Sequence, residues 1–136
     1  MGPRDSLPRR VVLATYAQLA LMGADLSSLV VFGFGLLGAT QNWEPDTGPG
    51  LVFLSWWALD GVLGLVLGVA AIVGFWRAAP WAWGVAIAHA VVTALDCCPG
   101  GWAFAVWALI AAVHPEVREW PERAKREETP LAEVFR

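Results

Sequence analysis

Four ionisable side chains interrupt or border long apolar runs in this sequence: Asp25, Asp60, His89 and Asp96. Charged groups are costly inside hydrocarbon, so they usually face a partner, a cavity or a proton pathway. One hypothesis is a proton or cation site in which these carboxylates exchange protons with His89. The alternative is structural: Asp60 and Asp96 lie at hydrated helix ends, and Asp25 is neutral and hydrogen-bonded to Ser28 or to a neighbouring helix.

The spacing of polar and small residues predicts an inward face on each of three helices. Residues three, four or seven positions apart share a helix face, and the sequence has three such sets: Gln18, Asp25 and Ser28; Asp60, Gly64 and Gly68; and His89, Thr93 and Asp96. At 1.5 Å of rise per residue, Asp25 lies about 22 Å and Asp60 about 25 Å from the flanking arginines, with His89 nearer mid-membrane. Turning these faces inward gathers the polar groups inside a bundle.

Gly61, Gly64 and Gly68 are predicted to form a helix-docking surface. Gly64 and Gly68 enclose three apolar residues as a GxxxG motif. Small residues let a second backbone approach closely, which promotes helix association where lipid supplies no hydrophobic driving force. The motif leaves two possibilities open, packing within the chain and contact with a partner subunit.

Cys97 and Cys98 are adjacent at the predicted outer end of the third apolar run. Vicinal thiolates bind soft metal ions, so the pair is a candidate metal or redox site. It resembles the vicinal cysteines of bacterial mercuric-ion transport proteins, which are also small and multi-spanning. That resemblance covers these two residues alone, and the sequence has no second cysteine pair to pass an ion onward.

The elements that must position these residues are apolar helices. Of the 136 residues, 57% are hydrophobic and 15% charged, against roughly 45–50% and 25% in an average soluble domain. Apolar runs of this length indicate membrane spans. We therefore expect an all-α integral membrane protein with a four-transmembrane-helix bundle over 11–115, a cytoplasmic N-terminus at 1–10 and a charged cytoplasmic tail at 116–136. The four spans are expected at about 11–39, 51–76, 80–96 and 101–115.

The distribution of basic residues predicts the orientation. With four spans, all nine Lys and Arg residues fall on one side of the membrane, at positions 4, 9, 10, 77, 118, 123, 125, 126 and 136. The positive-inside rule then places both termini in the cytoplasm. The Ala-, Gly-, Val- and Trp-rich composition with a single lysine suggests a bacterial inner-membrane protein.

The sequence contains no soluble catalytic motif, and no phosphate-binding glycine loop. We therefore expect a non-enzymatic protein without a cofactor. The expected role is an accessory or scaffolding subunit of a larger respiratory or photosynthetic membrane complex. Its partners would be the lipid bilayer and other membrane subunits, or further copies of itself, and not nucleic acid. The first alternative is a small oligomeric proton, ion or solute transporter using Asp25, Asp60 and His89, and the second is a thiol-based metal or redox protein.

Overall fold

Five α-helices make up the chain in the computed structural model, which describes residues 7–41, 48–95 and 99–134, with side chains placed at 7–41, 48–95 and 101–126. The described residues contain no strand. The helices are α1 (Arg9–Gln41), α2 (Gly48–Trp76), α3 (Ala82–Leu95), α4 (Pro99–Ala112) and α5 (Pro115–Val134). The chain is therefore all-helical, as the sequence predicts.

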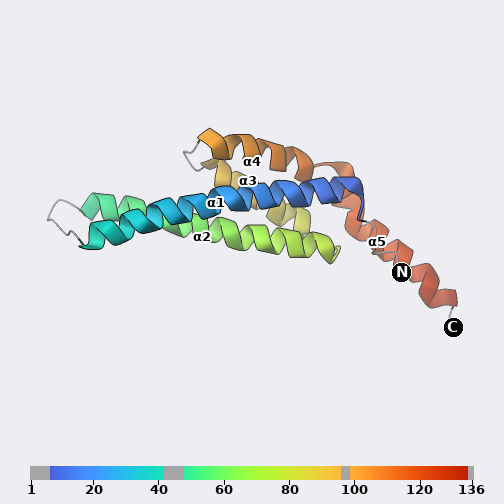
Figure 1. Ribbon diagram of the computed structural model, residues 1–136. Coiled ribbons are helices and arrows are strands. Elements are labelled where there is room, and N and C mark those ends of the chain that lie inside the picture. The colour runs from blue at the N-terminus through green and yellow to red at the C-terminus, as the bar shows by residue number, and fades with distance from the viewer. Residues whose placement is uncertain (1–6, 42–47, 96–98, 135–136) are drawn as a thin grey trace.

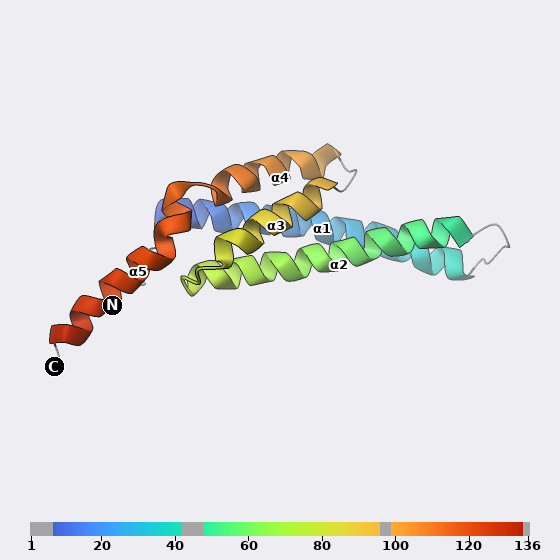
Figure 2. The ribbon, with the colours of Figure 1, turned by 180° about the vertical axis from the view of Figure 1, so that it is seen from behind.

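Helices α1 to α4 pack side by side, and α5 leaves them at one end (Figure 1). Helix α1 packs on α2, α2 on α3, α3 on α4, and α4 returns to contact α1. Each helix runs opposite to the one before it, and the view from behind gives the same order (Figure 2). This is the up-and-down arrangement that short connections favour.

The four helices differ greatly in length. Helix α1 has 33 residues and α2 has 29, whereas α3 and α4 have 14 each. Helices α1 and α2 are both long and apolar enough to cross a membrane, while α3 and α4 are shorter apolar helices. The far halves of α1 and α2 therefore project beyond the other two as a hairpin (Figure 2).

The helix limits of α1 to α4 differ from the predicted spans by no more than three residues at any end. Helix α3 begins at Ala82 because Pro80 and Trp81 lie in the turn that follows α2. Helix α4 ends at Ala112, and His114 starts the next helix by accepting a hydrogen bond from the Glu116 backbone amide at its Nδ1, 3.3 Å away. This is the role of an N-terminal cap. Helix α5 then continues to Val134, so most of the charged tail predicted at 116–136 is helical.

The apolar core is built mainly from alanine. At the end nearest α5, Phe75, Val117 and Trp120 pack with buried alanines of four helices. Next along the bundle, Leu21 packs with Ala17, Ala90, Ala105 and Ala108. Small side chains bring the helices close together, so a single larger or polar side chain in this core contacts several helices at once.

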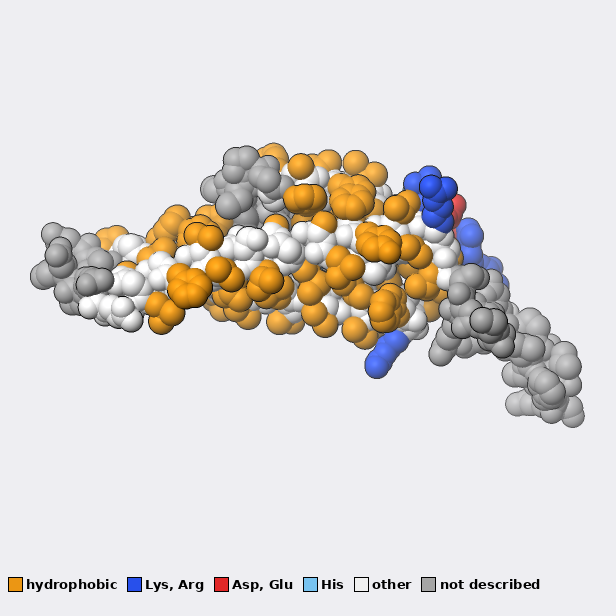
Figure 3. Space-filling model, viewed as in Figure 1, with side chains coloured by type: hydrophobic (Ala, Val, Ile, Leu, Met, Phe, Trp, Pro, Cys, Tyr) orange, Lys and Arg blue, Asp and Glu red, His pale blue; other side chains and the backbone are white. Residues whose placement is uncertain are grey.

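Large hydrophobic side chains cover the outside of the bundle instead of filling it. Hydrophobic side chains spread over the visible face, and most of the Lys and Arg side chains lie at the end from which α5 leaves (Figure 3). Only 17% of the most apolar window of α1 and 33% of that of α2 is buried. Buried core helices of a water-soluble protein would show the opposite distribution, so this surface favours a membrane environment.

Candidate functional site

Four polar side chains meet in the centre of the bundle, beside the buried alanines. Gln18 and Asp25 come from α1, and His89 and Thr93 come from α3. Each has at most 1% of its surface exposed. The two residues of each pair are four or seven positions apart and so share a helix face, and the two faces are turned toward each other. We call these four residues the polar cluster.

His89 is held at both ring nitrogens. Its Nδ1 lies 2.6 Å from Gln18 Oε1, and its Nε2 lies 2.6 Å from Asp25 Oδ2. The Gln18 amide nitrogen donates to the Ala86 carbonyl oxygen at 3.4 Å, which leaves the amide oxygen facing the ring. Because that oxygen only accepts, Nδ1 must carry a hydrogen.

The remaining proton lies between His89 and Asp25. Either Nε2 donates to the Asp25 carboxylate as an imidazolium, or protonated Asp25 donates to a neutral ring. Both forms have the same total charge of zero, which suits a fully buried position. Removing this proton would leave a lone pair on Nε2 facing a carboxylate, unless the ring hydrogen moved to Nε2 and the Gln18 amide turned over. The protonation state of the cluster is therefore coupled to a contact between α1 and α3.

Thr93 completes the cluster with one hydrogen and two acceptors. Its hydroxyl oxygen lies 3.2 Å from Asp25 Oδ1 and 3.0 Å from the His89 backbone carbonyl oxygen. A threonine hydroxyl donates one hydrogen, so it serves one acceptor at a time. When Thr93 donates to the carbonyl, the Asp25 Oδ1 atom loses that hydrogen bond. The Thr93 hydroxyl can thus stabilise the Asp25 carboxyl group or bond to its own helix.

Two glycines of α2 make room for the cluster. A Cβ atom added to Gly64 would lie 2.5 Å from the Asp25 Cγ atom, and one added to Gly68 would lie 2.8 Å from the His89 Cε1 atom. A Cβ on Gly68 would also collide with the Met22 side chain. The carboxylate and the imidazole therefore lie directly against the α2 backbone, at a spacing that only residues without a side chain allow.

The structure places the predicted helix-docking surface inside the chain. Gly61, Gly64 and Gly68 are all buried, and a Cβ on Gly61 would lie 2.9 Å from the Asp25 backbone carbonyl oxygen. The surface contacts α1 and His89 of the same molecule. Of the two possibilities that the sequence leaves open, this geometry corresponds to packing within the chain.

Asp60 lies one helical turn from Gly64, toward the projecting hairpin, and is only partly buried. Its Oδ2 atom is nevertheless buried and, among the residues that the structure describes, has no hydrogen-bond partner. Buried polar atoms are almost always hydrogen-bonded. A proton, a water molecule or a cation would satisfy this oxygen atom. Asp60 lies close to the polar cluster without belonging to it.

Helix α1 carries a longer row of buried polar side chains through the bundle. Thr15 and Ser28 are buried on the same face as the two cluster residues of α1. The Thr15 hydroxyl donates to the Val11 carbonyl oxygen at 3.0 Å. From Thr15 to Ser28 this row covers about 20 Å of the helix axis, interrupted by Leu21 between the two cluster residues.

Three further predicted site residues lie outside the described residues: Asp96, Cys97 and Cys98. The second histidine of the sequence, His114, caps α5. Among the residues that the structure describes, no three His, Cys, Asp or Glu side chains are grouped so as to hold a metal ion.

Sequence reasoning places Asp25 and His89 on inward faces but misses their direct contact and the role of Gln18 as the second partner of the ring. The signal for Gln18 is present, since it precedes Asp25 by seven residues on the same face. Comparison of this chain with protein-family models, with curated proteins and with solved structures finds no match.

Proposed function

We propose that this chain is a small multi-pass membrane protein that transfers protons through its helical bundle by way of Asp25 and His89. The observation that carries the proposal is the fully buried 2.6 Å contact between the two side chains. Burying an ionisable pair is costly, and ionisable side chains inside membrane helices commonly mark functional sites. Intramembrane carboxylates and histidines commonly relay protons.

The chemistry of the cluster favours a proton over a metal ion as the species that is bound and transferred. Nδ1 of His89 is engaged with Gln18, and Nε2 faces Asp25. A metal ion would need a lone pair on one of these nitrogens, so it would have to break one of the two contacts. A proton, by contrast, already has its donor and its acceptor in place at 2.6 Å.

The route would follow the buried polar row. Asp60 stands on one side of the cluster with an oxygen that has no described partner, and Gln18 and Thr15 stand on the other side. The cluster itself is sealed, so transfer requires transient opening of α3 against α1. The coupling between the proton and the Gln18 amide supplies a physical reason for such an opening.

The proposed topology has α1 and α2 crossing the bilayer and both termini in the cytoplasm. Helices α3 and α4 cover only about 21 Å each, less than the hydrocarbon thickness of about 30 Å. They would either cross a thinned bilayer or enter and leave from one side. In both cases the nine basic residues stay on the same side, so the positive-inside argument holds for two spans as for four. Single-cysteine labelling at either terminus tests this placement.

Proton flux in liposomes tests the function. The purified protein is reconstituted with a pH-sensitive dye inside the vesicles, and a pH gradient is imposed. We expect the gradient to collapse faster than in empty vesicles, and the rate to fall at least tenfold in Asp25→Asn and in His89→Gln. These variants keep hydrogen-bonding side chains of similar size but remove the shared proton.

A matched control separates lost chemistry from lost structure. Ser27 is exposed on the same helix, and its hydroxyl donates to the Gly23 carbonyl of its own helix at 2.8 Å. Ser27→Ala should leave the flux unchanged. A wild-type protein with no more flux than empty vesicles would refute the proposal, and so would an Asp25→Asn protein with full flux.

A second candidate function is the accessory or scaffolding subunit, and the projecting hairpin supports it. Helix α1 buries no residue after Ser28, and α2 buries none before Gly61. At about 50 Å, α1 is roughly 20 Å longer than the hydrocarbon. The projecting part is nevertheless apolar, with exposed side chains at Phe34, Val52 and Trp56. Helices of a larger complex would cover this surface.

Gentle purification from the native membrane tests the second candidate. A photo-crosslinking amino acid at Trp56, which is 67% exposed, should capture a specific partner subunit. The same substitution at Val106, an exposed position on α4, serves as the control. A chain that purifies alone and crosslinks only to lipid at both positions would argue against a scaffolding role.

A further inference from the structure

The amide of Gln18 has one orientation that suits both of its neighbours. Its nitrogen lies 3.4 Å from the Ala86 carbonyl oxygen, and its oxygen lies 2.6 Å from Nδ1 of His89. If the amide were turned over, its oxygen would face the Ala86 carbonyl oxygen, and two acceptors would meet without a hydrogen between them. Because a backbone carbonyl never donates a hydrogen, Ala86 fixes the direction of the hydrogen bonds that run from it through Gln18 to the ring.

The same direction continues through the His89 ring to Asp25. Nδ1 donates to the Gln18 amide oxygen, so this nitrogen carries a hydrogen whether the ring is neutral or charged. The other nitrogen, Nε2, lies 2.6 Å from Asp25 Oδ2, and the shared proton lies between these two atoms. Nε2 is therefore the ring atom that gains or loses a proton when the cluster exchanges one, while Nδ1 keeps its hydrogen.

Close packing holds the His89 ring in this position. Its Cε1 atom, the carbon between the two nitrogens, faces α2, where a Cβ added to Gly68 would lie 2.8 Å away. Turning the ring over about the Cβ–Cγ bond would place carbon atoms opposite Gln18 and Asp25. The ring is fully buried, so both hydrogen bonds would be lost at a cost in free energy. The ring therefore keeps one nitrogen for each of its two partners on α1.

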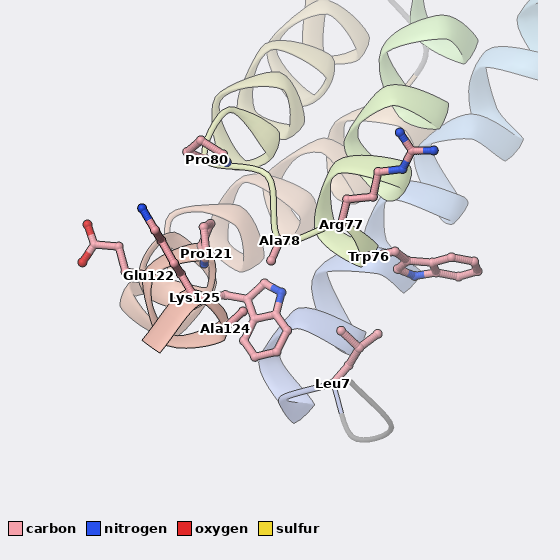
Figure 4. A pocket seen from close by; sticks show the side chains of 10 residues that line it. Leu7, Trp76, Arg77, Ala78, Pro80, Pro121, Glu122, Ala124 and Lys125 are labelled. Atoms are coloured by element: carbon pink, nitrogen blue, oxygen red, sulfur yellow. The ribbon is translucent and has the colours of Figure 1, made fainter. Parts of the chain in front are cut away.

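Apolar packing separates Gln18 from the open space at the α5 end of the bundle. Ala86, whose carbonyl oxygen accepts from the amide, belongs to the same buried apolar cluster as Phe75 and Trp120. Trp120 also lines a pocket between the end of α2 and α5, next to Trp76 (Figure 4). The described lining of this pocket contains no residue of the polar cluster. The Gln18 amide is therefore the partner of the ring on that side, with apolar side chains behind it.

We propose that Gln18 is a positioning residue for proton transfer, which fixes the ring hydrogen of His89 on Nδ1 so that Nε2 exchanges a proton with Asp25. The hydrogen bond made by one ring nitrogen determines the state of the other. In the transfer step one proton moves between Nε2 and Asp25 Oδ2, and the bond between Nδ1 and its hydrogen stays intact. The inference rests on the proposed proton transfer, but the position of the ring hydrogen is measured without any flux.

Nitrogen NMR of the whole protein in micelles, with isotope-labelled histidine, tests the position of the hydrogen. The sequence has two histidines, so a His114→Gln protein gives the signals of His89 alone. We expect a directly bonded hydrogen on Nδ1 at neutral pH. In Gln18→Met the acceptor is lost while the size of the side chain is kept, so a form with its hydrogen on Nε2 and none on Nδ1 should appear. An Nδ1 atom without a hydrogen in the parent protein would overturn the proposal.

Proton flux in liposomes tests the role, and Gln18→Glu is the rescue variant. We expect Gln18→Met to lower the flux about tenfold, because the ring loses the partner that orients it. A neutral carboxylic acid at this position, which burial favours, has a hydroxyl to donate to the Ala86 carbonyl and an oxygen to accept from Nδ1. Gln18→Glu should therefore keep both the hydrogen on Nδ1 and most of the flux. A Gln18→Glu protein as impaired as Gln18→Met would contradict the proposal.

Thr15 supplies a matched control on the same buried face of α1. Its hydroxyl donates to the Val11 carbonyl oxygen of its own helix, so Thr15→Val removes a buried polar group of similar size and should leave the ring signal and the flux unchanged. Equal losses of flux in Thr15→Val and Gln18→Met would overturn the proposal. A hydrogen on Nδ1 without flux would refute proton transfer and with it this role of Gln18, whereas flux without that hydrogen would refute the role of Gln18 alone.

Discussion

The two halves of the α1–α2 pair differ in how their side chains are packed, although the same two helices run through both. In the packed half, which ends at Ser28 and Gly61, α3 and α4 cover the pair and polar side chains are buried. In the projecting half, no residue of either helix is buried. There the two helices are joined by aromatic contacts, with Phe32 stacked on Trp57 at 5.5 Å and Phe53 packed against both rings.

Glycine shows the difference most clearly. In the packed half, Gly61, Gly64 and Gly68 each have neighbours that a Cβ would strike. In the projecting half, a Cβ on Gly33 would meet nothing within 4 Å. Glycine is thus a requirement of packing at these three positions of α2, whereas at Gly33 it leaves open space. Hydropathy does not distinguish these two situations, but substitutions do.

The largest expected effect is the loss of Asp25 from the packed half. Asp25→Ala leaves the His89 ring without its partner in a buried position, and breaking such a pair costs about 3–5 kcal/mol. The measurement is reversible unfolding in mixed micelles, followed by tryptophan fluorescence. Thr40→Ala is the control in the projecting half, because its exposed hydroxyl donates to the Leu37 carbonyl of its own helix. If the two substitutions had equal effects, the halves would not differ in the way described.

The second effect is overpacking at the polar cluster. Gly64→Ala would place a methyl group against the Asp25 carboxylate, at 2.5 Å from its Cγ. Overpacking of a well-packed core costs about 1–3 kcal/mol, and we expect a loss near the upper end because the neighbour is a hydrogen-bonded carboxylate. The same unfolding assay measures it. A neutral Gly64→Ala would mean that α1 and α2 are further apart than the structure shows.

The third effect is confined to the projecting half. Trp57→Ala removes the stacked contact with Phe32 and the edge contact with Phe53, and aromatic pairs contribute about 0.5–1.5 kcal/mol each. Hydrogen exchange should show faster opening of the hairpin from Phe32 outward, with the packed half still protected. Faster exchange at His89 as well would show that the two halves unfold as one unit.

The sequence predicts the inward faces correctly because side-chain direction on a helix follows from spacing alone. Gln18 with Asp25 and His89 with Thr93 face the interior as expected. Depth counted along each helix places Asp25 and His89 at different levels of the membrane, yet the two side chains lie in contact. Counting residues from the flanking arginines assumes upright helices of equal span, whereas α3 is less than half as long as α1. The relative register of two helices depends on how their alanine and glycine surfaces pack together. Amino-acid composition does not encode that packing.

The smallest effect carries the most information about what covers the projecting half. Gly33→Ala meets open space, so it should stabilise the isolated chain by about 0.5 kcal/mol through the higher helix propensity of alanine. In the native membrane the result depends on the environment of the hairpin. If lipid surrounds it, the methyl group is tolerated and co-purifying proteins are unchanged. If a partner helix packs closely on Gly33, the same methyl group stabilises the chain in micelles but weakens recovery of the partner. Higher stability in micelles together with weaker recovery of the partner would identify the projecting half as an interface. A loss of stability in micelles would instead mean that Gly33 is already packed within the chain.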